Sequence, residues 1–405
     1  MRKAVITSFA RTPIGAYLGG LREVPVQDLA SLTIKEAVKR SDVGNERVDG
    51  VVFGQVKGTG DCANLGRVAA LLAGLGEETP GYTVNRICGS GIQAVISAAL
   101  EIQTGHADIM IAGGAESLSR SPYYLPLSVR YEGLRNGTKD LLCMNTEYHK
   151  NCQPTSMYPP LNMGLTGENV VALHEISRED QDLFSYQSQM KAKAAMENGR
   201  FAEEIVPVEI KGKKDSRIVS VDEHPRPNTT LEALAKLKPA FKEGGTITAG
   251  NSSGMNDAAA ALVVMSEEKC MSLGLRPLAY VVDYAVHSIN PEVMGLGPVG
   301  AIQKLLARTK LKLEDIDLLE INEAFAGQVL GCLKELGNYM GSPLYDRLNV
   351  NGGAVALGHP LGMSGARIVG TIAHEFKYRD ARYGIASACI GGGQGLALLL
   401  ENPKA

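Results

Sequence analysis

The 405-residue sequence contains no tryptophan, and aromatic residues make up only 5% of it. It also lacks an excess of basic residues, because its formal net charge is −3. This balance excludes the basic surface that nucleic-acid-binding proteins use. No stretch approaches the run of about 18 apolar residues that a membrane-spanning helix needs. We therefore expect neither a nucleic acid nor a membrane among its partners.

Closely spaced cysteine pairs are missing as well. There are seven cysteines, an odd number, and no two of them stand at Cys-x-x-Cys spacing. Such a set favours neither a disulfide framework nor a zinc ribbon, so we expect no metal site. A reducing cytoplasm fits this set best. The cysteines are Cys62, Cys88, Cys143, Cys152, Cys270, Cys332 and Cys389.

Strand-like and helix-like segments alternate towards both ends of the chain. Such alternation predicts an α/β fold built from parallel β-α-β units. The predicted strands are 5–9, 48–56, 109–112, 258–265, 279–286, 316–321 and 385–389. The predicted helices are 27–41, 64–73, 177–198, 267–273, 298–309 and 366–376.

The middle of the chain, residues 119–249, is instead rich in proline, tyrosine, asparagine and charge. Its one clear amphipathic helix is 177–198, with Ser177 as N-cap and Gly199 as C-cap. We predict that this region is an inserted loop domain. A chain of this length is also expected to form two or three domains.

Segments 107–114 and 381–392 resemble each other, and each follows an apolar helix that begins in a glycine-rich turn. This echo indicates a duplicated half-domain, with a site between the two halves. The predicted division is an N-terminal half at 1–118 plus 250–276, the loop domain at 119–249 and a C-terminal half at 277–405.

One stretch organises the chain: Asn-Arg-Ile-Cys-Gly-Ser-Gly at 85–91, followed by an uncharged apolar run at 92–100. A helix that is apolar all round is normally buried. Its free N–H groups and positive dipole end stabilise a thiolate, so we expect Cys88 to have a lowered pKa. The alternative is that Cys88 is only a small buried apolar residue.

Three further stretches carry polar groups that suit catalysis. His359 lies in the glycine-rich segment 349–367, where the glycines allow a substrate to approach the backbone. Cys389 ends a strand and precedes a run of glycines whose N–H groups can bind an anion. Asn322 follows a buried strand, where its amide can orient water or polarise a carbonyl, or serve equally well as a helix N-cap.

Other patterns offer competing sites. A zinc site from Cys88, Cys389 and His359 lacks a fourth ligand at recognisable spacing. The Gly-x-Gly-x-x-Gly at 295–300 does not follow a strand, so a dinucleotide site is not expected. The Gly-x-Ser-x-Gly at 250–254 permits a serine hydrolase of Ser252, Asp257 and His359, which leaves both cysteines without a role. Along the chain these three residues follow the order Ser, Asp, His, which is usual for one class of catalytic triad.

Taken together, four blocks resemble the signatures of thiolases, which are acetyl-CoA C-acyltransferases. The blocks are Asn-Arg-Ile-Cys-Gly-Ser-Gly at 85–91, Asn-Glu-Ala-Phe at 322–325, the glycine-rich 349–367 and Cys-Ile-Gly-Gly-Gly-Gln-Gly at 389–395. They occur in the family order, and the similarity extends over nearly the whole chain. The resemblance implies the layered αβαβα thiolase fold, with two similar α/β halves and an inserted loop domain.

The resemblance also implies catalytic roles. Cys88 would take the acyl group, His359 would accept its proton, and Cys389 would be the acid/base for the second acyl-CoA. Asn322 would hold a water, and the N–H groups of Cys88 and Gly391 would bind the tetrahedral intermediate. The reaction would be the reversible Claisen condensation of two acetyl-CoA molecules, with coenzyme A thioesters as substrates and no cofactor.

For the substrate, the resemblance aligns Met163 with the acyl pocket and Arg226 and Ser253 with CoA-contacting positions. It implies further substrate contacts for Ala249, Ala324 and Phe325. Lysines and arginines between 211 and 242 suit an anionic CoA, or form a solvated charged loop. These are Lys211, Lys213, Lys214, Arg217, Arg226, Lys236, Lys238 and Lys242.

The segment expected to form the acyl pocket departs from the sequence pattern of short-chain thiolases. This chain has Asn162-Met163-Gly164 where those enzymes usually have His-Met-Gly, and the loop 130–161 is longer. Acetoacetyl-CoA is the expected substrate, and a longer or branched acyl chain is the alternative. A non-catalytic acyl-CoA or lipid carrier is the alternative from another class. Family members are homodimers or homotetramers, and either is expected here.

Overall fold

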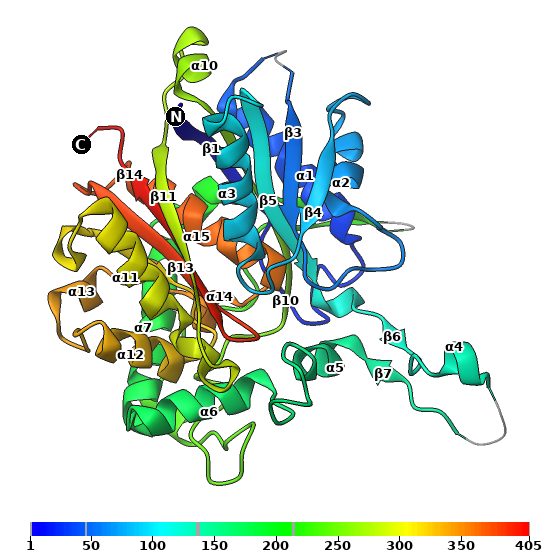
Figure 1. The fold of residues 1–405 in the computed structure, drawn as a ribbon, viewed down its shortest axis with the longest axis vertical. Helices are drawn as coiled ribbons and strands as arrows, with labels where there is room; N and C mark the ends of the chain where they lie inside the picture. Colours follow the sequence, from blue (N-terminus) through cyan, green and yellow to red (C-terminus); the bar gives the residue numbers. More distant parts are fainter. Residues whose placement is uncertain (1, 45–46, 135–137, 213–214, 405) are drawn as a thin grey trace.

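The computed structural model describes residues 2–44, 47–134, 138–212 and 215–404 (Figure 1). Its strands are β1 (Ala4–Arg11), β2 (Gly15–Ala16), β3 (Gly50–Gly54), β4 (Gly81–Val84), β5 (Ile109–Ser117), β6 (Tyr123–Tyr124), β7 (Leu142–Cys143), β8 (Val208–Lys211), β9 (Ser216–Val219), β10 (Asn256–Ser266), β11 (Ala279–Ser288), β12 (Leu318–Ile321), β13 (Tyr383–Ile390) and β14 (Gln394–Glu401).

The α-helices are α1 (Val26–Ser41), α2 (Leu65–Ala73), α3 (Ser90–Gln103), α4 (Val129–Glu132), α5 (Met144–Lys150), α6 (Met163–Leu173), α7 (Arg178–Glu197), α8 (Arg200–Glu204), α9 (Leu231–Ala235), α10 (Glu267–Ser272), α11 (Gly297–Thr309), α12 (Ala326–Glu335), α13 (Pro343–Asp346), α14 (Ala354–Leu357) and α15 (Leu361–Glu375). Short 3-10 helices are η1 (Leu118–Arg120), η2 (Pro291–Leu296) and η3 (Leu313–Asp315). Within the described ranges, no helix is both long enough and apolar enough to cross a bilayer.

The large sheet consists of two similar halves. Its strand order is β12-β13-β14-β11-β1-β10-β5-β3-β4, and β1 and β11 pair antiparallel at the seam. On one side of the seam, β5 follows a long helix and lies between the parallel strand β3 and the antiparallel strand β10. On the other side, β13 follows a long helix and lies between the parallel strand β12 and the antiparallel strand β14. The echo between 107–114 and 381–392 falls on β5 and β13, which confirms the predicted duplication.

Strand direction was only partly predicted. The pairs β3–β4, β3–β5 and β12–β13 are parallel, as β-α-β units require. The strands β1, β10, β11 and β14 instead pair antiparallel with their neighbours. The predicted parallel β-α-β units are therefore present in both halves, and the sheet as a whole is mixed because β10 and β14 run antiparallel beside β5 and β13.

Alternating side chains bury both faces of the sheet. In β10, Ala260 and Leu262 face the cluster that includes α3 and α15, whereas Ala261 and Val263 face α1 and α2. In β14, the even-numbered leucines face the same central cluster, and Leu399 faces the cluster with α11 and α12. Helices α3 and α15 thus lie between the two half-sheets, which gives the predicted αβαβα layers (Figure 1).

Most predicted elements are present, but others were missed, among them β14, α6 and α12. The last predicted strand was 385–389, whereas β14 follows β13 directly as its antiparallel partner. Helices α6 and α12 were not predicted. Helix α15 begins at Leu361, five residues before the predicted start at 366. The prediction began late because Gly362 and Gly365 have low helix propensity. In the structure both glycines lie inside the helix, where close packing requires them.

The region 119–249 carries α4 to α9 and two small hairpins. Its predicted long helix is α7, and Ser177 caps it by accepting a hydrogen bond from the Asp180 N–H. Gly199 follows in a left-handed conformation with φ +74°. Figure 1 shows that β6, α4 and β7 form an arm that extends away from the layers.

Helices α3 and α15 cross where neither carries a Cβ. A Cβ on Gly91 would lie 2.4 Å from the Ala366 backbone nitrogen, and one on Gly365 would lie 2.4 Å from the Ile92 backbone nitrogen. Real Cβ atoms do not approach backbone atoms so closely, so both positions require glycine. This crossing brings the N-terminal ends of the two central helices together.

We expect Gly365→Ala to destabilise the protein by about 1–3 kcal/mol, because the added methyl group overpacks the helix crossing. Alanine has the higher helix propensity, so a loss of stability has to come from the contact with α3. Urea unfolding at fixed protein concentration measures the effect. The control is Gly60→Ala, where a Cβ meets open space and the change should stay below about 0.5 kcal/mol. Equal stability of the two variants would contradict this account of the crossing.

Candidate active site

Cys88 lies in a sharp turn between β4 and α3. Ile87 adopts a left-handed φ of +46°, which is unusual for a β-branched residue. The turn is held by Ser90, whose hydroxyl donates to the Ile87 carbonyl at 2.7 Å and accepts from the Arg86 N–H at 2.9 Å. The Asn85 side chain also accepts from the Ile87 N–H at 2.9 Å. The sulfur is thus fixed at the entry of the buried helix.

The Cys88 thiol is only 7% exposed and packs with Val56, Leu118 and Leu361. Burial, and after it the neighbouring Cys152, raise its pKa to about 12. Hydrogen bonds from the Gly391 and Cys88 N–H groups act in the opposite direction but do not prevail. The prediction of a lowered pKa was therefore wrong, because desolvation outweighs the helix end. Cys88 rests as a neutral thiol and needs a base.

His359 is held in the orientation that a base would need. Its Nδ1 lies 2.6 Å from the Ser364 Oγ, and the Ser364 hydroxyl donates to the Pro360 carbonyl at 3.1 Å. The hydroxyl therefore accepts from Nδ1–H, which leaves the lone pair on Nε2. The Asn322 Nδ2 lies 3.4 Å from this Nε2. The His359 N–H in turn donates to the Asn256 Oδ1 at 3.0 Å.

Asn322 lies at the carboxyl end of β12 and is 1% exposed. Within the part of the chain that the structure describes, its buried Oδ1 has no hydrogen-bond partner. The N-cap of the next helix, α12, is Phe325, so Asn322 does not cap it. A buried amide oxygen without a partner is costly, and a substrate group or a water would satisfy it.

Cys389 and Gly391 complete the site from the C-terminal half. Cys389 is fully buried near the end of β13, and its pKa is raised first by burial and then by the neighbouring Cys88. The two thiols therefore share one environment. Gly392 and Gly393 have φ of +83° and +82°, which lets the chain reverse into β14 and aim the Gly391 N–H at the Cys88 sulfur.

Sequence reasoning missed the residues that hold this arrangement. The Glu323 carboxylate accepts from the Ser188 hydroxyl, the Asn349 amide and the Val355 N–H at 2.8–3.0 Å. It thereby ties the end of β12 to the segment that leads to His359. The position of Glu323 between apolar runs could have indicated a buried carboxylate with hydrogen-bond partners. Ser364 gave no signal, because only the folded chain brings it to the imidazole.

Several predicted substrate residues lie beside Cys389. Met163, Ala324 and Phe325 pack into the same apolar cluster as this cysteine. Met163 begins α6, and Asn162 caps that helix by accepting from the Leu165 N–H at 2.9 Å. The departure from His-Met-Gly therefore has a local structural reason, since asparagine is a preferred N-cap.

The remaining predicted CoA contacts lie further out. The Ser253 N–H donates to the Ala324 carbonyl at 3.0 Å, which joins it to the cluster around Cys389. Arg226 and Ala249 are exposed. Burial and the charge of Arg226 lower the pKa of His224 to about 4. Lys213 and Lys214, like residues 135–137 of the acyl-end loop, lie outside the described residues.

The competing sites do not form. The Ser252 hydroxyl donates to the Thr248 carbonyl, and the Asp257 carboxylate accepts from Ser117 and Ser119, so no Ser-His-Asp triad is assembled. The Gly-x-Gly-x-x-Gly at 295–300 spans the end of η2 and the start of α11, not a strand end. Among the described residues, no group of three or more His, Cys, Asp or Glu side chains is placed to hold a metal ion.

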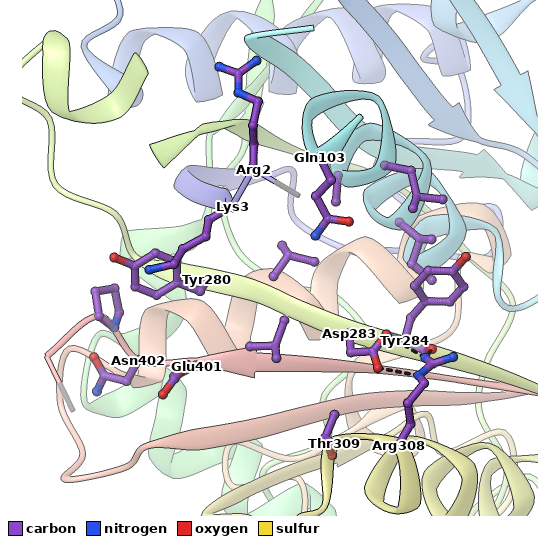
Figure 2. Close-up of a pocket in the computed structure, with 16 residues that line it drawn as sticks. Arg2, Lys3, Gln103, Tyr280, Asp283, Tyr284, Arg308, Thr309, Glu401 and Asn402 are labelled. Atoms are coloured by element: carbon purple, nitrogen blue, oxygen red, sulfur yellow. Dashed lines mark hydrogen bonds and ion pairs between the residues drawn. The ribbon is translucent and has the colours of Figure 1, made fainter. Parts of the chain in front are cut away.

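A cavity of about 910 Å³ lies elsewhere, between α3, β11 and the chain ends (Figure 2). Its charged side chains are already paired: Arg308 with Asp283, and Arg2 with Asp108. Figure 2 shows the Arg308 pair at one end of the cavity. None of the predicted catalytic residues lines it.

Two α/β halves that meet at two thiols and an imidazole, in αβαβα layers, define a protein of the thiolase fold. The family described as the N-terminal domain of thiolase matches residues 4–268, and that described as its C-terminal domain matches 275–402. The chain therefore belongs to the thiolase family.

Known relatives resemble it over their full length. An acetyl-CoA acetyltransferase of Chromobacterium violaceum is 46% identical over 99% of this chain and 100% of its own. The crystal structure of the Bacillus anthracis acetyl-CoA acetyltransferase matches with a TM-score of 0.93 at 45% identity, covering 99% of each chain. Human mitochondrial 3-ketoacyl-CoA thiolase in complex with CoA matches with a TM-score of 0.91 at 40% identity, covering 99% of this chain and 98% of its own.

Because Cys88 rests as a neutral thiol, its reaction with iodoacetamide should depend on His359. We expect His359→Ala to slow alkylation of Cys88 at neutral pH by about 100-fold, the lower range for loss of a general base. Mass spectrometry of the Cys88 peptide measures the rate, and the partly exposed Cys143 in the same sample is the internal control. Unchanged alkylation of Cys88 would mean that the thiolate forms without the imidazole.

Proposed function

We propose that this chain is an acetyl-CoA C-acetyltransferase that interconverts two acetyl-CoA molecules with acetoacetyl-CoA and CoA through an acyl-Cys88 intermediate. The observation that carries the proposal is the proximity of two buried thiols, Cys88 and Cys389, together with the oriented imidazole of His359, two residues before the Leu361 that packs with Cys88. One thiol alone would suffice for acyl transfer. A second is needed only where a carbon atom must also gain or lose a proton.

The thiolysis direction begins at Cys88. His359 Nε2 takes the proton of the thiol, and the thiolate attacks the 3-keto carbon of acetoacetyl-CoA. The oxyanion that forms accepts hydrogen bonds from the N–H groups of Gly391 and Cys88, which already point at this sulfur. These donors cost no reorganisation, because the turn around Gly392 and Gly393 fixes them.

The carbon–carbon bond then breaks, and Cys389 supplies a proton. The departing group is the enolate of acetyl-CoA, whose oxygen is stabilised by protonated His359 and by a water held at Asn322. Burial keeps Cys389 protonated, so it can give its proton to the enolate carbon. This releases acetyl-CoA and leaves acetyl-Cys88 and a Cys389 thiolate.

CoA completes the cycle. The Cys389 thiolate takes the proton of the CoA thiol, and the CoA thiolate attacks acetyl-Cys88. Cys88 leaves as a thiolate and recovers its proton from His359, so every group returns to its starting state. Condensation is the reverse of these steps. All of them use thiols, imidazole and backbone N–H groups, so we propose no metal or redox cofactor.

For the substrate contacts, we propose that Met163, Ala324 and Phe325 line the acyl side. Arg226, Ala249 and Ser253 would contact CoA. The human relative bound to CoA supports CoA thioesters as the substrates. The similarity to 3-ketoacyl-CoA thiolases also keeps a longer acyl chain as the second candidate.

We also propose that the protein is a homodimer or homotetramer that works in the cytoplasm. Strand β4 is at the edge of the large sheet, and Tyr82 on it is 44% exposed beside the exposed Leu71 and Leu72 of α2. The arm in region 119–249 exposes Tyr131 and Leu127 by 80% or more. A second copy would cover such apolar surfaces. The seven cysteines, all without disulfides, support a reducing compartment.

Thiolysis of acetoacetyl-CoA by the purified protein tests the proposal. We expect Cys88→Ser to abolish it and Cys389→Ser to reduce it by about 10²–10⁴-fold, the range for loss of a general acid. Acetylation of Cys88 by acetyl-CoA, followed by intact mass, should fall far less in Cys389→Ser, since CoA leaves as a stable thiolate. A wild type that binds CoA but turns over no 3-ketoacyl-CoA would instead support a carrier.

A further inference from the structure

A third sulfur, that of Cys152, lies at the site. A Cβ built on Gly391 would be 3.2 Å from the Cys152 Sγ and 3.4 Å from the Met163 Sδ. The N–H of this same glycine points at the Cys88 sulfur, where the acyl oxygen would be bound. The two sulfurs therefore bound the space beside the acyl carbon. Of these two residues, only Met163 was predicted to lie there.

The position of Cys152 is set by the turn beneath it. A Cβ on Gly392 would lie 2.6 Å from the Cys152 carbonyl oxygen, so the backbone of Cys152 rests directly on the β13–β14 turn. The Cys152 thiol is directed back at the Tyr148 carbonyl, 3.8 Å away. Tyr148 itself packs against the apolar cluster of Cys88. Cys152 and Tyr148 thus form a wall of the site, which faces both Gly391 and Cys88.

A buried lysine ties this wall to the N-terminal half. Lys57 is 2% exposed, and its Nζ donates to the Met144 carbonyl at 3.2 Å and to the Asn145 Oδ1 at 3.0 Å, both in α5. The Asn145 amide donates in turn to the Leu118 carbonyl at 2.9 Å. Burying an ammonium group is unfavourable unless it is hydrogen-bonded, so these contacts fix α5, and with it Cys152, against the core.

We propose that Cys152 determines acyl chain length: its side chain closes the space beside the acyl carbon and restricts the site to the acetyl group. This inference rests on the proposed function and names the residue that limits the length of the acyl chain. Each further methylene on the acyl group would meet the Cys152 sulfur. One methylene in such a pocket changes kcat/KM by roughly 10- to 200-fold.

The test compares kcat/KM for thiolysis of acetoacetyl-CoA, 3-ketohexanoyl-CoA and 3-ketooctanoyl-CoA. We expect Cys152→Ala to raise the 3-ketohexanoyl to acetoacetyl ratio by about 10-fold or more, mainly through better turnover of the longer substrate. Cys152→Ser is nearly isosteric and should leave the ratio close to that of the wild type. This serine variant separates the size of the side chain from the chemistry of the thiol.

Two further variants sharpen the test. Cys143→Ala removes a partly exposed cysteine of the same region, on β7, and should leave the ratio unchanged. Lys57→Met removes the tether of α5 without altering the wall itself, and should raise the ratio in the same direction as Cys152→Ala. Because both act through one wall, the double variant should gain less than the product of the two single effects.

The outcomes distinguish the inference from the proposed function. An unchanged ratio in Cys152→Ala, with a wild type active on acetoacetyl-CoA, overturns the role of Cys152. Loss of acetoacetyl-CoA turnover in Cys152→Ser also overturns it, since the thiol would then act chemically. A wild type that turns over none of the three substrates overturns the proposed function instead.

A labelling experiment keeps the inference testable if the alanine variant does not fold. In a Cys88→Ser variant, the reaction of Cys152 with methyl methanethiosulfonate should be slowed by saturating acetoacetyl-CoA, because the acyl end covers the sulfur. Labelling of Cys143 in the same sample is the control and should not change. Equal protection of both cysteines, or of neither, overturns the inference.

Discussion

The close approach of α3 and α15 is the constraint on which the rest of the structure depends. Gly91 and Gly365 let the two helices touch along their backbones, so their N-terminal ends meet between the half-sheets. Cys88 lies two residues before the start of one helix, and His359 lies two residues before the start of the other. A wider crossing would separate the thiol from the base, whatever the quality of the turns that present them. The two related halves thus contribute different chemistry from equivalent places.

Burial gives this site its character. The layers that pack around α3 and α15 also remove water from Cys88 and Cys389, and both thiols are consequently held protonated. A neutral thiol is a poor nucleophile but a suitable acid. In the mechanism we propose, the same desolvation makes Cys88 dependent on His359 and suits Cys389 to the role of proton donor. In the same environment, backbone donors such as the Gly391 N–H act more strongly than they would in water.

The sequence was sufficient for features that are local in the chain. Alternating apolar residues, caps such as Ser177 and the four sequence blocks predicted most elements and the main residues of the candidate site. It was not sufficient for features that depend on distant partners. The pKa of Cys88 depends on how much protein surrounds it, and β14 is defined by pairing with β13 and β11. Ser364, Glu323 and Cys152 have roles only through contacts that no spacing reveals.

The place of β10 in the sheet has a consequence for how the chain is made. This strand lies between β1 and β5, although it is synthesised long after both of them. While residues 118–255 emerge from the ribosome, β1 and β5 lack their common neighbour, and their unpaired backbone edges stay open to wrong partners. Such delayed, non-local pairing slows folding and exposes nascent chains to aggregation. The topology that places two halves around one site therefore makes the growing chain dependent on protection until Ser266 has been added.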